Sequence, residues 1–125
     1  MGRILNLAWV AILAGAVATP AMAGNPQAGA QAFRTQCAVC HANKTKAPPG
    51  VGPNLFGVVG RKAGTLPGFA YSPAMKGAGL SWSEAELKRY LADPAKLVKG
   101  NRMPFAGIKN PGQVDEVVDY LVTLK

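Results

Sequence analysis

Apolar residues recur at helical spacing near the C-terminus, where the chain shows its clearest amphipathic stripe. The stripe consists of Val114, Val117, Val118 and Leu121. Asn110 and Pro111 stand before it as an N-cap and a proline at the first helical position. The pattern therefore predicts a helix that begins near residue 110 and buries one apolar face.

A second apolar stripe predicts a helix in the middle of the chain. Leu87, Tyr90 and Leu91 fall at i, i+3 and i+4 and follow a capping-box sequence, Ser83 to Glu86. Ser81 and Glu84 offer a second register for the same cap. We expect this helix to end before Pro94, because the residue before a proline disfavours helical backbone.

Three shorter helices are predicted where a capping residue is followed by proline. Asn25-Pro26 opens the first, whose inward face carries Ala30, Phe33 and Cys37. Ser72-Pro73 opens a single turn that runs to Lys76 and ends at Gly77. Asp93-Pro94 opens another short helix that reaches about Val98.

Residues 42–70 have no sustained period and are punctuated by glycine and proline throughout. A loop of this length is unusual in a compact domain unless it packs along a cofactor as an Ω-type loop. Its apolar residues are then expected to turn inward: Leu55, Phe56, Val58 and Leu66. No strand pattern and no internal repeat compete with the helices, so the chain is predicted to be all-α.

The strongest chemical signal is the run Cys37-Ala38-Val39-Cys40-His41, which has the spacing of a c-type haem attachment site. The two intervening residues let both thiols reach the vinyl groups of one haem, while His41 faces the iron from the same side. A zinc site would need further ligands, and His41 is the only histidine. A thioredoxin-type pair needs a βαβ context, and a disulfide across two residues would close a small, strained loop.

The first 23 residues predict a secretory signal peptide. Arg3 gives a basic start, an apolar run extends from Ile4 to Ala18, and Ala21-Met22-Ala23 has the pattern of a cleavage site. An uncleaved membrane anchor is the alternative, although the run is shorter than the ~20 residues that a spanning helix needs. Cleavage after Ala23 would leave residues 24–125 as one domain in the bacterial periplasm.

Composition and charge narrow the choice of partners. The 15 glycines and 10 prolines suit a chain wrapped around a rigid group, so the haem-free form is expected to be largely unfolded. The net charge is +8, or +7 once Arg3 is removed, which indicates an anionic partner. Because the basic residues are scattered and the chain is exported, an acidic redox protein is favoured over nucleic acid.

If His41 binds one face of the iron, the residue on the other face decides the chemistry. An open position would permit peroxidase or gas-binding activity, whereas a second ligand restricts the haem to electron transfer. After the signal, the only methionines are Met75 and Met103. We favour Met103, because it lies in an irregular segment flanked by glycine and proline, whereas Met75 on a short turn suits packing.

Seven runs together resemble class I cytochromes c, above all mitochondrial cytochrome c and its soluble bacterial relatives. They are Cys37–His41, Gly52–Gly57, Gly60–Gly64, Pro67–Ser72, Leu80–Trp82, Tyr90-Leu91 and Met103–Ile108. The resemblance covers essentially all of residues 24–125. It implies the all-α cytochrome c fold, with short helices and long loops around one covalent haem c. It also implies a carrier of single electrons, not an enzyme, and a monomer is the default expectation.

The resemblance also assigns roles to individual residues. The carbonyl of Pro53 would accept a hydrogen bond from the ring of His41, Tyr90 would lie near the sulfur of Met103, and Phe105 would cover the haem near its exposed edge. Three donors to the inner haem propionate are implied: Arg61, Tyr71 and Trp82. The first and last helices would cross through Gly29, Phe33 and Tyr120.

The chain departs from the family pattern in two respects. Asn101 and Met75 replace a threonine and an asparagine where polar contacts to the propionates or a buried water are expected, so the reduction potential should differ. Lysines common in the basic docking ring are replaced by Gln31, Gln36, Pro48, Gly50 and Ala95, while Lys96, Arg102 and Lys109 remain. The implied partners are a bc1-type complex, an oxidase, a photosynthetic reaction centre or a dehydrogenase.

Overall fold

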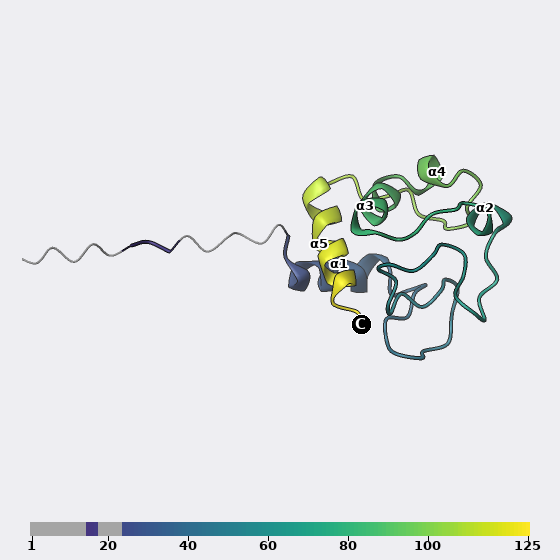
Figure 1. The fold of residues 1–125 in the computed structure, drawn as a ribbon, viewed down its shortest axis with the longest axis horizontal. Coiled ribbons are helices and arrows are strands. Elements are labelled where there is room, and N and C mark those ends of the chain that lie inside the picture. The colour runs from purple at the N-terminus through teal and green to yellow at the C-terminus, as the bar shows by residue number, and fades with distance from the viewer. Residues whose placement is uncertain (1–14, 18–23) are drawn as a thin grey trace, which may run out of the picture.

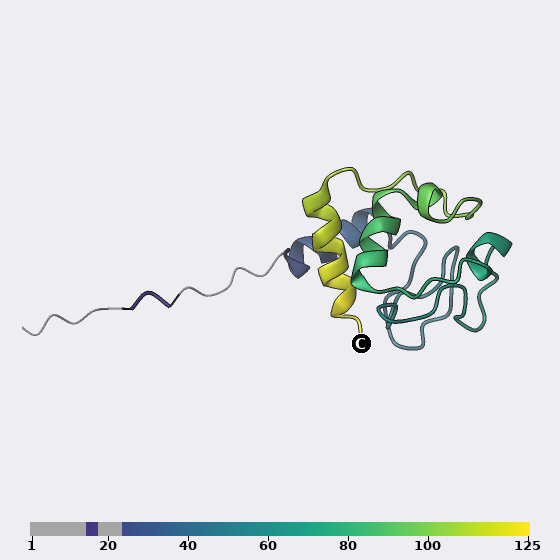
Figure 2. The ribbon, with the colours of Figure 1, turned by 45° about the horizontal axis from the view of Figure 1, so that its top comes forward.

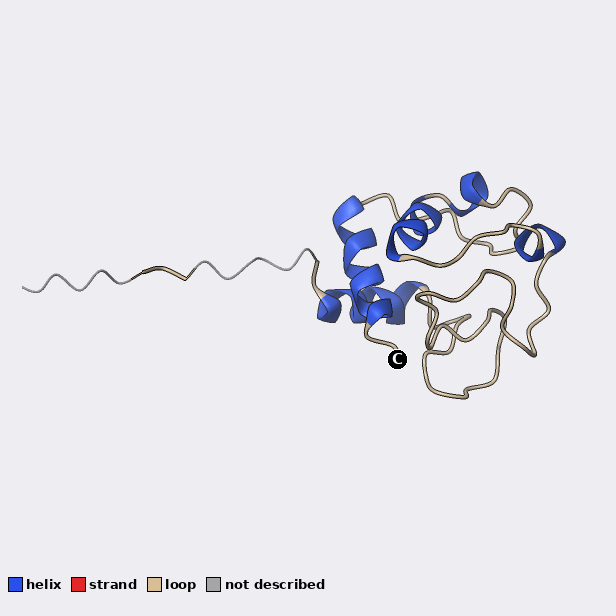
Figure 3. Ribbon diagram, in the orientation of Figure 1, coloured by secondary structure: helices blue, strands red, loops and turns tan. Residues whose placement is uncertain are grey.

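The computed structural model describes residues 15–17 and 24–125. Within them the chain forms short helices joined by long loops (Figure 3): α1 Pro26–Gln36, α2 Pro73–Lys76, α3 Glu84–Ala92, α4 Pro94–Leu97 and α5 Pro111–Val122. Apart from residues 15–17, the expected signal peptide lies outside the described part. No helix in that part combines the length and the apolar character needed to span a bilayer.

The predicted helices are confirmed, and their caps explain where each one begins. The N-cap side chains of Asn25, Ser72, Asp93 and Asn110 each accept a hydrogen bond from a backbone N–H of the first turn. For α3 the cap is Ser83, whose hydroxyl accepts from the N–H of Glu86 at 3.2 Å, so the register that begins at Ser81 is not used. Each cap satisfies one of the donors that a helix start leaves unpaired.

Helices α1 and α5 cross in close contact, as Figures 1 and 2 show from two directions. A Cβ on Gly29 would overlap the backbone carbonyl of Glu116 and lie 2.9 Å from the Cβ of Tyr120. The ring of Phe33, which is 1% exposed, lies 5.3 Å from that of Tyr120. The crossing therefore has the composition that the sequence resemblance implied.

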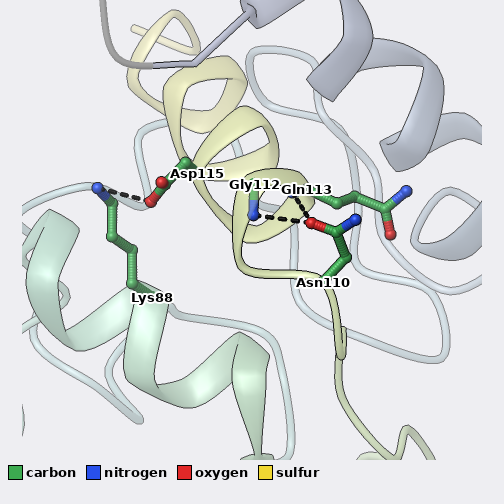
Figure 4. Close-up of polar contacts among 5 residues, drawn as sticks. All are labelled: Lys88, Asn110, Gly112, Gln113 and Asp115. Atoms are coloured by element: carbon green, nitrogen blue, oxygen red, sulfur yellow. Dashed lines mark hydrogen bonds and ion pairs between the residues drawn. The ribbon is translucent and has the colours of Figure 1, made fainter.

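Helix α3 also packs against α5. Lys88 on α3 forms an ion pair of 2.9 Å with Asp115 on α5, near the turn where Asn110 caps α5 through the N–H groups of Gly112 and Gln113 (Figure 4). Both charged side chains of the pair are about 40% exposed, so the pair contributes little to stability. Apolar contacts hold the two helices together, since Leu87 on α3 and Val114 on α5 are buried.

The long loop between α1 and α2 is held by hydrogen bonds to distant segments. The N–H of Gly57 donates to the carbonyl of Leu124, and the N–H of Gly60 donates to that of Trp82. Lys62 and Ser81 form an isolated antiparallel bridge, flanked by the bond from the N–H of Ala63 to the carbonyl of Leu80. The sequence pattern did not predict this bridge, because neither partner lies in an alternating stretch.

The α1–α5 crossing predicts the effect of adding one methyl group at Gly29. Gly29→Ala should lower the free energy of unfolding of the haem-loaded protein by roughly 1–3 kcal/mol, because the two backbones must separate. Gln31→Ala, on the exposed face of the same helix, is the control and should change it by less than about 0.5 kcal/mol. Denaturant unfolding measures the free energy of unfolding of both variants. Helix propensity alone predicts that Gly29→Ala is stabilising, and that result would contradict the packing argument.

Candidate functional site

A cavity of about 470 Å³ lies inside the domain, between the helices and the long loops. Its wall is mostly apolar and includes Leu55, Val58, Leu87, Leu91 and Leu121. The structure also brings to this wall every residue that the sequence had marked for a site: Cys37, Cys40, His41, Pro53, Arg61, Tyr71, Trp82, Tyr90, Met103 and Phe105. Residues as far apart in the chain as Cys37 and Leu121 therefore share one cavity.

The cysteines and the histidine reach the cavity through a tight turn at the end of α1. The N–H of Cys37 donates to the carbonyl of Phe33, and the N–H groups of Cys40 and His41 both donate to the carbonyl of Cys37. Burial, with a smaller contribution from Cys40, raises the pKa of Cys37 to about 11. The thiol is therefore protonated and neutral at neutral pH, and a thioether formed from it would be neutral as well, which suits a buried position.

The orientation of the His41 ring is determined by one hydrogen bond. Its Nδ1 lies 2.8 Å from the carbonyl oxygen of Pro53. Because a carbonyl only accepts, Nδ1 must carry the proton, and Nε2 of the neutral ring keeps its lone pair. Burial lowers the pKa of His41, and the bond to Pro53 opposes this shift only in part. His41 thus offers a neutral imidazole nitrogen of the kind that binds iron.

The two candidate methionines both lie on the cavity wall. Met75 belongs to α2, whereas Met103 lies in the irregular segment between α4 and α5. The backbone of Met103 is held on both sides: its N–H donates to the side-chain oxygen of Asn101 at 2.9 Å, and its carbonyl accepts from the N–H of Phe105 at 2.8 Å. The Met103 segment therefore has a defined conformation without helical structure.

Arg61 supplies a positive charge at the cavity wall. Two of its guanidinium nitrogens donate to the carbonyls of Asn54 at 2.9 Å and Phe56 at 2.7 Å. Burial lowers the pKa of Arg61, and the neighbouring Tyr71 opposes the shift. Within residues 24–125 no carboxylate forms an ion pair with this side chain. An anionic group in the cavity would compensate its charge.

Aromatic residues provide further hydrogen-bond donors on the wall. The hydroxyl of Tyr71 accepts from the N–H of Leu66 at 3.3 Å, which leaves its own proton free to donate. The rings of Trp82 and Tyr90 pack with centroids 4.9 Å apart. Burial raises the pKa of Tyr90 to about 12, so its hydroxyl stays protonated and remains a donor.

The residues present fit a haem group. Two thiols and an imidazole come from adjacent positions, the wall is apolar enough for a porphyrin, and Arg61 with Tyr71 matches its carboxylates. A metal site made of protein ligands alone is not indicated, because no group of three Cys, His, Asp or Glu side chains comes together in the described residues.

Comparison with known proteins decides the family. The family model described as Cytochrome c matches residues 26–125. The chain belongs to the cytochrome c family. It is 50% identical over 101 residues to cytochrome c2 of Rhodomicrobium vannielii, a match that covers 81% of this chain and 80% of that protein. Cytochrome c of Chlamydomonas reinhardtii is 44% identical over 101 residues, covering 81% of this chain and 90% of that protein.

A solved structure agrees with this family assignment. Cytochrome cH from Methylobacterium extorquens matches with a TM-score of 0.75 and 48% sequence identity, covering 80% of this chain and 99% of that chain. The chain is thus a class I cytochrome c with one haem c bound covalently through Cys37 and Cys40. It is an electron-transfer protein, not an enzyme, and its partners are redox proteins.

Two residues help to position the site of this cytochrome c, although the sequence analysis assigned neither of them an individual role. Gly52 is buried against the imidazole of His41, and its N–H donates to the carbonyl of Cys40 at 2.8 Å. The buried Asn54 donates to the carbonyls of Lys44 and Ala47 and so closes the loop before Pro53. The Gly-Pro-Asn sequence at 52–54 was a turn signal that could have directed attention to both.

The contact between Gly52 and His41 predicts a difference between two glycines of the same loop. A Cβ at Gly52 would lie 2.5 Å from Cε1 of His41, so Gly52→Ala should displace the ring, change the haem absorption spectrum and lower stability by roughly 1–3 kcal/mol. Gly50→Ala is the matched control, since its Cβ would meet only the carbonyl of Cys40 at 3.5 Å. Spectra and thermal unfolding of both holoproteins test this, and indistinguishable variants would refute it.

Proposed function

We propose that His41 and Met103 are the two axial ligands of the haem iron and that the chain shuttles single electrons between membrane or periplasmic redox proteins. Bound haem c supplies the reversible one-electron couple of its iron. The observation that carries the proposal is the single cavity wall shared by the neutral His41 imidazole and the Met103 thioether. With both ligands retained in the two oxidation states, little rearrangement opposes electron transfer.

The other cavity residues then have supporting tasks. Pro53 holds the His41 ring through its carbonyl, as the 2.8 Å distance supports. Three donors hold the inner haem propionate: Arg61, Tyr71 and Trp82. Tyr90 keeps a protonated hydroxyl beside the Met103 sulfur, and Phe105 covers the haem near its exposed edge. Each assignment uses a side chain that lines the cavity.

Met75 is the second candidate for the sulfur ligand. If neither methionine bound the iron, the open position would instead favour a peroxidase or gas-binding function. Met75 also lines the cavity, so its position alone does not separate it from Met103. We prefer Met103, because Met75 lies on a helical turn, where the backbone restricts how far its sulfur can approach.

Substitution of each methionine by leucine tests the ligand set. Met103→Leu should alter the ferric spectrum, lower the reduction potential and allow rapid binding of carbon monoxide or cyanide at neutral pH, because the thioether is lost while the volume is kept. Met75→Leu, the matched control at the same cavity, should leave spectrum and ligand binding as in the wild type. The reverse result would assign Met75, and rapid binding by the wild type would favour the enzyme-class alternative.

Docking is proposed at the cavity mouth, where the surface combines apolar and basic residues. Val39 and Val51 line the cavity and are 81% and 73% exposed. Exposed apolar side chains at one place are typical of an interaction surface. Arg102, which is also exposed and lines the same cavity, adds positive charge that suits an acidic partner. A bc1-type complex, an oxidase, a reaction centre or a dehydrogenase would provide such a partner.

This mixed surface predicts a shallow dependence of docking on salt. The rate constant for electron transfer with a bc1-type complex should fall by less than about tenfold between low and physiological ionic strength. The reason is that the docking surface around the cavity mouth carries few lysines that could steer the encounter. Stopped-flow kinetics at several salt concentrations measure the slope, with a mitochondrial cytochrome c as the control. If the rate constant fell with ionic strength as steeply as that of the control, apolar residues would not contribute to docking as proposed.

Export to the periplasm, with cleavage of the signal after Ala23, is part of the same proposal. The described domain supports it, because α1 is capped by Asn25, two residues after the expected cleavage site. An oxidising compartment also suits a chain whose two cysteines are consumed by haem attachment.

A further inference from the structure

Asn101 uses both polar atoms of its side chain within the segment that carries Met103. Its Nδ2 donates to the carbonyl of Val98 at 2.9 Å, and its Oδ1 accepts from the N–H of Met103 at 2.9 Å. The partners determine the orientation of the amide, because a carbonyl only accepts and an N–H only donates. The side chain thus links the residue three positions before it to the residue two positions after it.

The two ends of this link differ in how they are held. Val98 is 4% exposed and belongs to the hydrophobic core, so it provides a rigid anchor. Asn101 itself lies on the cavity wall, and its backbone N–H also donates to the carbonyl of Val98 at 3.1 Å. Met103 lies outside any helix, so no helical hydrogen bond holds its N–H. Without Asn101, that donor would have no partner among the described residues.

We propose that Asn101 is a positioning residue: its side-chain oxygen holds the backbone N–H of Met103, while its own backbone N–H is bonded to the core at Val98, and this hold sets how readily the Met103 sulfur leaves the iron. The inference rests on the proposed ligation by Met103. It gives the asparagine at this position a task beyond the propionate or water contact expected from the resemblance, since the second proton of its amide nitrogen is not used in these two bonds.

Two nearly isosteric substitutions separate the two hydrogen bonds. Asn101→Asp keeps an oxygen that accepts from the N–H of Met103 but cannot donate to Val98, whereas Asn101→Leu loses both bonds. The readout is the rate at which imidazole binds to the ferric holoprotein at pH 8, where this probe is neutral and insensitive to the added charge. Asn101→Leu should speed binding about tenfold, and Asn101→Asp should stay within about threefold of the wild type.

A purely structural role is excluded by a second measurement on the same proteins. If Asn101→Leu lowers the unfolding temperature but leaves the rate of imidazole binding unchanged, the proposal is overturned. Equal acceleration by the Leu and Asp substitutions would also overturn it, because the bond to Met103 would then be irrelevant.

The double variant distinguishes failure of this inference from failure of the ligand assignment. In a Met103→Leu background, Asn101→Leu should produce no further acceleration, since no sulfur remains to be released. If Met103→Leu alone fails to speed imidazole binding, the ligation by Met103 is wrong and the inference falls with it. If Met103→Leu speeds imidazole binding while Asn101→Leu does not, the ligation by Met103 stands and only the role of Asn101 is refuted.

Discussion

The structure depends on apolar packing around a space that the chain does not fill with its own side chains. Several core residues also form the cavity wall: Val58, Trp82, Leu87, Tyr90 and Leu121. In a well-packed interior such residues have partners on every side. Here haem c supplies the missing contacts, so the cofactor is part of the hydrophobic core as well as the redox centre. A domain of this size has little other core to rely on, and its stability is therefore coupled to haem attachment.

The loops around the cavity are stabilised by side chains in place of regular secondary structure. Buried backbone groups need hydrogen-bond partners, and in a loop these cannot come from a helix or a sheet. Asn54, Arg61 and Asn101 supply them, each bonding backbone atoms of its own loop. Two of the three also line the cavity. Residues at the site consequently hold the loops in shape, and a substitution there affects both folding and redox chemistry.

Local signals in the sequence predicted the helices and the attachment site. Caps such as Asn25 and Asn110 depend only on neighbouring residues, and the C-x-x-C-H motif carries its chemistry in five positions. Features that join distant segments were not predictable in this way. The bridge between Lys62 and Ser81 depends on where the long loop returns, and the contact of Gly52 with His41 depends on how that loop folds over the motif. Ser81, the alternative cap, takes part in this bridge, while Ser83 caps the helix.

The two proposed iron ligands are held by different means, and this difference bears on how the centre responds to stress. His41 lies directly after the covalent attachment and is oriented by the Pro53 carbonyl, so several bonds must break before it moves. Met103 has no covalent tie to the haem. Its N–H donates to the side-chain oxygen of Asn101 and its carbonyl accepts from the N–H of Phe105, two hydrogen bonds worth about 1 kcal/mol each. A local opening of this segment breaks fewer contacts than global unfolding and therefore requires less free energy. If Met103 is the ligand, the sulfur side is the weaker side of the centre, and the sequence of the Met103 segment, more than that of the attachment motif, controls access to the iron.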